Sequence, residues 1–231
     1  MFWKDEKRPA DFAVPDDVVD VVFTIDCREL PVDHAHSLST AIRRAAPWIS
    51  EDAQIGIHTV HVAGSQNGWE RPEHGTATRL LLSRRTKLTI RAPKPAVERL
   101  QQDLCSAVLD VDGCLLTVGE AHTRLLSKQG TLQARYVVAE SVDETDEAFL
   151  GRMAHELSEL GIRVRRALCG RTNLLMTPAG PIATRSLMLA DLTPEESVRL
   201  QRHGLGPLRQ MGCGIFIPHK GIDSVRGAGD D

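Results

Sequence analysis

The chain has 231 residues, of which 42% are hydrophobic and 26% are charged, and its formal net charge is -3. This length allows one large domain or two small ones, and the composition excludes a disordered or fibrous chain. No stretch approaches the roughly 18 consecutive apolar residues of a membrane helix, and the N-terminus lacks the apolar run of a signal peptide. We therefore expect a cytoplasmic protein.

Charge is distributed unevenly along the chain. Residues 79–99 carry seven basic side chains against one acidic one, and residues 163–185 carry five arginines and no acid. Residues 140–159 carry seven acidic side chains and one arginine. Because electrostatic attraction dominates nucleic-acid affinity, two acid-poor basic stretches in an acidic protein favour RNA as a partner. The five cysteines form no CxxC pair, so we predict neither a disulfide framework nor a zinc site.

The first half of the chain predicts strands and helices in the order β-α-β-β-α-β. The β-branched residues 18–26 indicate a buried strand, and Asp33 resembles an N-cap for a helix that begins near His34. The remaining predicted elements are β-like runs within 55–64 and 77–93, a helix over 95–104 and a strand pair over 107–118 turned at Asp112-Gly113.

After a predicted linker at 127–131, the same order of elements starts again. Its predicted elements are a strand at 132–141, a helix at 143–160, strands at 163–170 and 181–192 joined by a hairpin, a helix opened by Thr193-Pro194-Glu195-Glu196, and a last strand at 214–218. Two such units predict an α+β protein with tandem ferredoxin-like (RRM-like) domains at 18–127 and 132–220. We expect flexible ends at 1–17 and 221–231.

Residues 204–214, which we call the glycine loop, form the most unusual stretch. Gly204, Gly206, Gly212 and Gly214 flank Arg209 in a doubled G-x-G pattern. Glycine permits positive φ and close backbone approach, so this loop can offer bare N-H groups to phosphate or sugar oxygens. No Lys-Ser or Lys-Thr follows the glycines and a strand comes next, which disfavours ATP and NAD and predicts no cofactor.

The sequence resembles the CRISPR-associated endoribonucleases that cut precursor guide RNA within its repeats. The glycine loop before the last strand is similar to that family's hallmark, and stretches such as IDCRELPVDHAHSLS, HVAGSQNGWERPE and LSRRTKLTIRAP resemble its MYXAN-subtype branch. The resemblance spans residues 18–220 and implies a tandem ferredoxin-like fold. It also implies metal-independent cleavage by the upstream 2'-hydroxyl, retention on the 3' hairpin of the repeat RNA, and membership of a multi-subunit, Cascade-like surveillance complex.

Members of that family often carry a histidine around the first helix, where this chain has His34 and His36. Two residues apart on a helix, these rings point in different directions, so we expect one of them to act as general acid or base. We favour His34, with His36 in reserve. His58 and His61 make a poor metal pair, and both a buried, hydrogen-bonded role and a second catalytic role stay open for them.

Arginine and lysine side chains are the candidates for phosphate contacts and for recognition of base edges. The predicted RNA-binding set is Arg84, Arg85 and Lys87 on one strand, Arg163, Arg165, Arg166, Arg171 and Arg185 in the second basic stretch, and the glycine-loop residues Gly204, Gly206, Arg209, Gly212 and Gly214. Two other functions remain open from the sequence: a non-catalytic subunit that binds repeat RNA, and a small-molecule enzyme on a ferredoxin-like scaffold.

Overall fold

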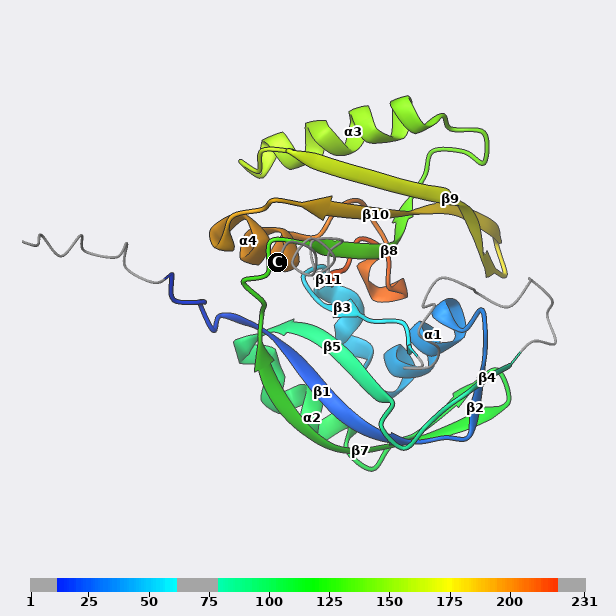
Figure 1. The fold of residues 1–231 in the computed structure, drawn as a ribbon. Helices are drawn as coiled ribbons and strands as arrows, with labels where there is room; N and C mark the ends of the chain where they lie inside the picture. The colour runs from blue at the N-terminus through cyan, green and yellow to red at the C-terminus, as the bar shows by residue number, and fades with distance from the viewer. Residues whose placement is uncertain (1–11, 62–78, 220–231) are drawn as a thin grey trace, which may run out of the picture.

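The computed structural model describes residues 12–61 and 79–219, which form two α+β units of adjacent chain segments (Figure 1). The first unit contains β1 (Val18–Asp26), β2 (Glu29–Pro31), α1 (Ala35–Ala45), η1 (Pro47–Glu51), β3 (Gly56–Ile57), β4 (Arg79–Leu81), β5 (Lys87–Pro93), η2 (Lys94–Ala96), α2 (Val97–Leu104), β6 (Val108–Val111) and β7 (Cys114–Leu125). No helix in these described ranges is both long enough and apolar enough to cross a membrane.

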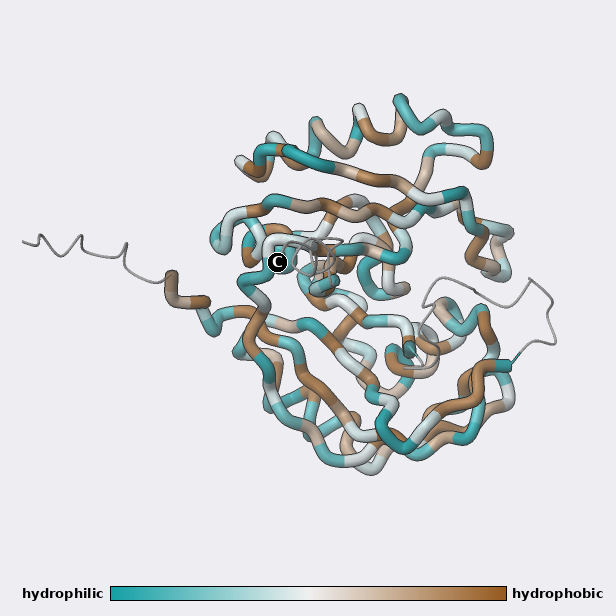
Figure 2. The backbone as a smooth tube through the Cα atoms, viewed as in Figure 1, coloured by the Kyte–Doolittle hydropathy of each residue, from teal (hydrophilic) through white to brown (hydrophobic). Residues whose placement is uncertain are grey.

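The first unit is an antiparallel sheet with the strand order β3-β5-β1-β7-β6. Alternate residues of β1, among them Val21 and Phe23, face α1 and α2 and share one buried core with Leu38 and Leu100. Figure 2 shows β1 mostly in brown, as expected for a central strand that is buried on both sides. A separate pair, β2 and β4, lies beside this sheet.

The second unit repeats this architecture. It contains β8 (Leu132–Val138), α3 (Asp146–Glu159), β9 (Arg166–Thr177), β10 (Gly180–Ala190), α4 (Pro194–His203), η3 (Arg209–Met211) and β11 (Phe216–Pro218). Its strand order, β11-β8-β10-β9, is the ferredoxin-like order in which the first strand lies between the third and the fourth. Phe149 and Met153 of α3 and Leu200 of α4 pack on its sheet. The predicted tandem ferredoxin-like fold is therefore confirmed.

Several predicted elements differ from those observed. In the described part of the β-like run at 55–64, residues 55–61, the strand is the two-residue β3, and in the described part of the run at 77–93 a turn separates β4 from β5. Arg84 and Arg85 lie in that turn, so they do not share a strand with Lys87. Residues 65–76, with the predicted Asn67-Gly68 turn, lie outside the described residues.

Side-chain contacts hold the predicted linker and the described part of the N-terminal segment. A flexible end was expected at 1–17, but within its described residues, 12–17, Phe12 and Val14 pack against a small buried cluster. The linker is held by α4, because the single hydroxyl proton of Ser197 is shared between the carbonyl oxygens of Ser127 and Gln129, which lie 3.1 and 2.7 Å from Oγ. The two units are thus joined by an ordered connection.

An arginine from a buried ion pair in the first unit also bonds to the second unit. Asp20 of β1 and Arg91 of β5 are 3% and 0% exposed, and Arg91 Nε donates to Asp20 Oδ1 at 2.8 Å. Arg91 Nη1 then crosses to the second unit and donates to the carbonyl oxygens of Gln201 and Phe216, both at 2.9 Å. Gln201 lies in the last turn of α4, where carbonyl oxygens lack helical partners and attract a cation.

The charges around Asp20 decide its ionisation. Burial alone raises the pKa of this carboxyl group, but the attraction of Arg91 and the contacts with His58 outweigh burial and hold the pKa well below its usual value. Asp20 also accepts a hydrogen bond at 3.1 Å from Nη2 of Arg124, a largely exposed side chain. The carboxylate is therefore charged whenever the protein is folded near neutral pH.

We predict that Arg91→Met lowers the free energy of unfolding by about 3–5 kcal/mol, because the change leaves a buried carboxylate without its main partner. Arg124→Met is the matched control, since it removes a mostly exposed partner of the same carboxylate and should cost less than about 1 kcal/mol. Urea unfolding followed by circular dichroism measures both. Equal losses in the two variants would contradict a central role for Arg91.

Candidate functional site at the junction of the two units

His34 lies in the interior, which corrects the expectation that its ring faces a substrate from the first turn of α1. The residue is 3% exposed. Its Nδ1 is 2.8 Å from the carbonyl oxygen of Pro31, and its Nε2 accepts a hydrogen bond from the backbone N-H of Val60 at 2.9 Å. Both ring nitrogens are therefore occupied by backbone groups in the neutral form, and protonation of Nε2 would break the bond to Val60.

The start of α1 also differs from the prediction. His34 itself is the N-cap and makes no side-chain cap hydrogen bond, while Asp33 instead accepts a bond at 2.7 Å from the backbone N-H of Met176 in β9. Ala35 packs against Tyr136 and Cys213 of the second unit. The first turn of α1 is thus fixed at the junction, and His36 in that turn is partly exposed.

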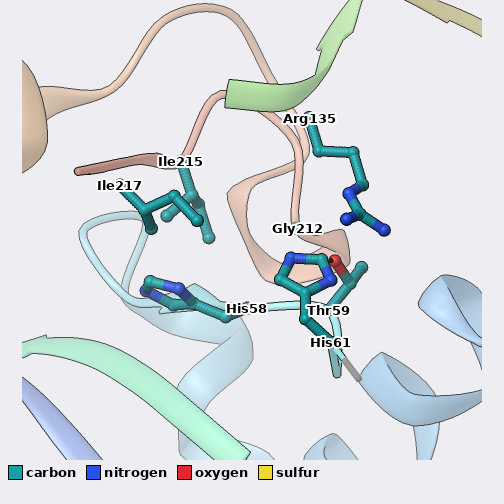
Figure 3. A pocket seen from close by; sticks show the side chains of 7 residues that line it. All are labelled: His58, Thr59, His61, Arg135, Gly212, Ile215 and Ile217. Atoms are coloured by element: carbon teal, nitrogen blue, oxygen red, sulfur yellow. Dashed lines mark hydrogen bonds between the residues drawn. The ribbon is translucent and has the colours of Figure 1, made fainter. Parts of the chain in front are cut away.

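A hollow opens at the same junction, between the segment that follows β3 and the second unit (Figure 3). Its lining residues are His58, Thr59, His61, Arg135, Gly212, Ile215 and Ile217. Burial, together with the nearby charge of Arg135, lowers the pKa of His61 to about 3, so this ring is neutral at physiological pH. Burial also lowers the pKa of His58, whose Nε2 is 3.6 Å from Asp20 Oδ1.

The glycine loop is built for close packing between backbones. All four predicted glycines have positive φ, between 66° and 83°. A Cβ atom at Gly214 would lie 1.9 Å from the carbonyl oxygen of Leu205, and one at Gly212 would lie 2.8 Å from Cγ2 of Thr59 in the first unit. The doubled G-x-G pattern therefore lets the two ends of the loop touch each other and lets the loop touch the opposite unit.

The glycine N-H groups already have acceptors within the protein, contrary to the expectation that they are bare. The acceptors are the carbonyl oxygen of Leu200 for Gly204, Oε2 of Glu156 for Gly206, the carbonyl oxygen of Arg209 for Gly212 and the carbonyl oxygen of Tyr136 for Gly214. In this conformation the four glycines shape the loop but do not offer these donors to an anion.

Arg209, the basic residue of the glycine loop, is 8% exposed, so it is not presented to RNA in this conformation. Its Nε and Nη2 atoms have no hydrogen-bond partner among the described residues. Burial and the neighbouring charge of Arg91 lower its pKa to about 10. The guanidinium is still cationic at neutral pH and adds positive charge to the junction.

The predicted basic residues fall into two groups. Arg84, Arg85, Arg163 and Arg171 are exposed and Lys87 is partly exposed. Within the described ranges, none of the five forms an ion pair with a carboxylate. Arg165, just before β9, and Arg166, its first residue, are exposed but pair with Glu196 and Asp191, at 2.6 and 3.0 Å. The first group is free to contact phosphates.

Arg185 has a structural role, which corrects its assignment to RNA binding. It is 5% exposed and forms an ion pair with Asp146 at the start of α3. Its Nε also donates to the carbonyl oxygen of Gly170 at 2.9 Å, and its guanidinium lies 5.2 Å from the ring centroid of Phe149. These contacts connect α3 to the sheet and leave the guanidinium buried.

Sequence reasoning missed Arg135 of β8. This side chain is exposed, lines the hollow and lies close enough to His61 to affect its titration. It stands alone between apolar residues of a strand, so no cluster or motif marks it. Across the described ranges, no group of three or more His, Cys, Asp or Glu side chains gathers where it could hold a metal ion.

Comparisons with known proteins identify the family of this chain. A family model described as "Cas6: Cas6 Crispr" matches residues 19–221. The chain belongs to the Cas6 family. It is 30% identical over 201 residues to a Myxococcus xanthus (strain DK1622) protein named "CRISPR-associated endonuclease Cas6", which covers 87% of this chain and 81% of the relative. The resemblance found in the sequence is thus confirmed for the family.

Solved structures share the fold with this Cas6 protein. One described as "CRISPR associated protein Cas6" has a TM-score of 0.57 at 9% identity, covering 88% of this chain and 100% of its own. One described as "An RAMP protein binding different RNA substrates" has a TM-score of 0.58 at 14% identity, covering 86% and 98%. A Cas6-related protein from Pyrococcus furiosus has a TM-score of 0.55 at 11% identity, covering 87% and 98%.

We predict that Gly214→Ala lowers the free energy of unfolding by more than about 3 kcal/mol, because it adds a backbone clash to an unfavourable φ. Gly206→Ala is the matched control: its φ is also positive, but open space surrounds the added Cβ, so the loss should be about 1–2 kcal/mol. Urea denaturation measures both changes. A Gly214 variant as stable as the Gly206 variant would disprove the packing role.

Proposed function

We propose that this Cas6 protein is a metal-independent endoribonuclease that cuts CRISPR repeat RNA to mature guide RNA. Its membership of the family and the name of its relative, an endonuclease, support the activity. In the proposed reaction the 2'-hydroxyl upstream of the scissile bond attacks its own phosphate. The oxygen-phosphorus bond to the 5'-oxygen then breaks, leaving a 2',3'-cyclic phosphate and a 5'-hydroxyl.

His36 is our candidate for the proton transfers. The observation that carries this choice is the engagement of both His34 nitrogens by Pro31 and Val60, which leaves His36 as the partly exposed histidine in the first turn of α1. Histidine exchanges protons near neutral pH, so one ring can take the proton of the 2'-hydroxyl or supply one to the leaving 5'-oxygen. The N-terminus of α1 favours an anionic phosphate beside that ring.

The exposed cations support the binding part of the proposal. Arg84, Arg85, Lys87, Arg163 and Arg171 have no carboxylate partner among the described residues and can contact the phosphates of a repeat hairpin. We propose that these contacts keep the protein on the 3' hairpin of its product. We also propose that the bound protein joins a multi-subunit, Cascade-like complex.

We predict that His36→Ala slows cleavage of the repeat RNA by roughly 100- to 10,000-fold, the usual contribution of a general acid or base. The assay is a single-turnover reaction with enzyme in excess over labelled repeat RNA. Because His36 is partly exposed, its replacement should leave the melting temperature unchanged. His155→Ala, on an exposed face of α3, is the matched histidine control and should cut at the wild-type rate.

Three outcomes of this assay are informative. Wild-type cleavage by His36→Ala would remove that residue from the mechanism. Slow cleavage with unchanged affinity for an uncleavable RNA, in which a 2'-deoxy nucleotide blocks the attack, would support proton transfer by His36. If the wild-type protein shifts the RNA in a gel but leaves it intact, the protein is a non-catalytic repeat-binding subunit.

The metal-free part of the proposal has its own test. We expect the single-turnover rate to be the same with excess EDTA as with added Mg²⁺, because the proposed mechanism uses only side chains and the RNA 2'-hydroxyl. The products should carry a 2',3'-cyclic phosphate, which resists phosphatase until acid opens the ring. Loss of cleavage in EDTA that Mg²⁺ restores would overturn this part.

A further inference from the structure

The hollow at the junction has no role in the proton transfers proposed above. Three of its lining residues, His58, Thr59 and His61, come from the first unit. The other four come from β8, the glycine loop, the residue between that loop and β11, and β11 itself. It therefore exists only when the two units are docked. His34 fixes its first-unit wall, because the bond from Val60 to His34 holds the segment between Thr59 and His61.

The lining of the hollow is cationic and contains no carboxylate. Arg135 is exposed there, and within the described residues no acidic group lies within ion-pair distance of it. Behind the wall, Asp20 lies next to His58, and its charge is matched by Arg91 and Arg124. The hollow thus presents positive charge that the folded protein does not neutralise.

His61, which lines the hollow, has a ring nitrogen without a hydrogen-bond partner among the described residues. Its Nε2 lies 3.5 Å from Oγ1 of Thr59, and its Nδ1 is buried without a hydrogen-bond partner among the described residues. When the Thr59 hydroxyl donates to Nε2, the neutral ring carries its proton on Nδ1 and becomes a donor. A buried donor without an acceptor is costly, which points to a ligand atom that accepts its hydrogen bond.

We propose that this hollow receives one backbone phosphate of the bound RNA, with Arg135 and the Nδ1-H of His61 as its donors. Figure 3 shows the two side chains entering from opposite units. A guanidinium beside a neutral donor, with no acceptor carboxylate in the lining, suits a phosphate oxygen. Ile215 and Ile217 form the apolar side, which strengthens these contacts by limiting water.

This inference rests on the proposed function, because it requires the RNA to enter the junction. It makes Arg135 a binding residue that holds the strand in register with the first turn of α1, where His36 lies. The bond between His34 and Val60 connects the two places directly, since His34 precedes that turn and Val60 lies between Thr59 and His61.

The test measures the affinity of Arg135→Gln for the 2'-deoxy, uncleavable repeat RNA at several salt concentrations. We expect binding about tenfold weaker than wild type and a smaller salt dependence, by about 0.7–1 in the log-log slope, as for one lost phosphate contact. Because Arg135 is exposed, its melting temperature should not change. Arg99→Gln on α2, where the guanidinium stacks on Trp48, is the control and should bind like wild type.

A methylphosphonate scan locates the contact. Replacing one phosphate at a time with this neutral group should reveal one position at which wild type and Arg135→Gln bind equally weakly, since the partner of Arg135 is already lost there. If the loss of affinity caused by Arg135→Gln and the loss caused by the methylphosphonate add at every position, the inference is overturned. It is also overturned if Arg135→Gln binds with wild-type affinity. In both cases RNA binding and the proposed function stand. Absence of any RNA binding by the wild-type protein would overturn both.

Discussion

The guanidinium of Arg91 is the contact on which the relative position of the two units depends. It is fully buried, neutralises Asp20 within the first sheet, and donates to two backbone carbonyl oxygens of the second unit. Such a group is costly to remove from water, and it is tolerated because nearly every donor has an acceptor. An apolar interface could slide, whereas these directional bonds fix both the distance and the angle between the sheets.

The functional features follow from that docking. The first turn of α1 contacts the second unit through Ala35, the glycine loop contacts Thr59 through Gly212, and the hollow draws its lining from both units. Neither ferredoxin-like unit contains the site by itself. The hollow and the contacts of the first turn of α1 therefore exist only where the two units meet.

The fold was largely predictable because its signals are local. The run of β-branched residues at 18–26, the Asp112-Gly113 turn and the Thr193 capping box each depend on neighbours in the chain, and all three lie where expected. Strand length was less predictable, since the run at 55–64 has the composition of a strand, but its described residues, 55–61, include a strand of only two residues. Pairing depends on what lies opposite, which composition does not encode.

The roles of individual side chains were less predictable for the same reason. His34 and His36 are nearly equivalent in sequence, and only the carbonyl of Pro31 and the amide of Val60 distinguish them. Arg185 belongs to a basic stretch, yet Asp146 and Phe149, distant in sequence, hold it inside. Arg135 has no motif around it and gains significance from His61 on the opposite unit.

The internal bonding of the glycine loop bears on how inactive members of such a family arise. Gly214 and Gly212 are required by their close contacts with Leu205 and Thr59, and the positive φ of all four glycines favours glycine, so selection for a stable fold alone is enough to retain them. On the role proposed for His36, a descendant that lost nuclease activity could change this residue and still keep every glycine. The glycine signature is therefore a marker of the folded architecture. On the proposed mechanism, a genome survey that separates cleaving members from members that only bind RNA should examine the start of the first helix instead.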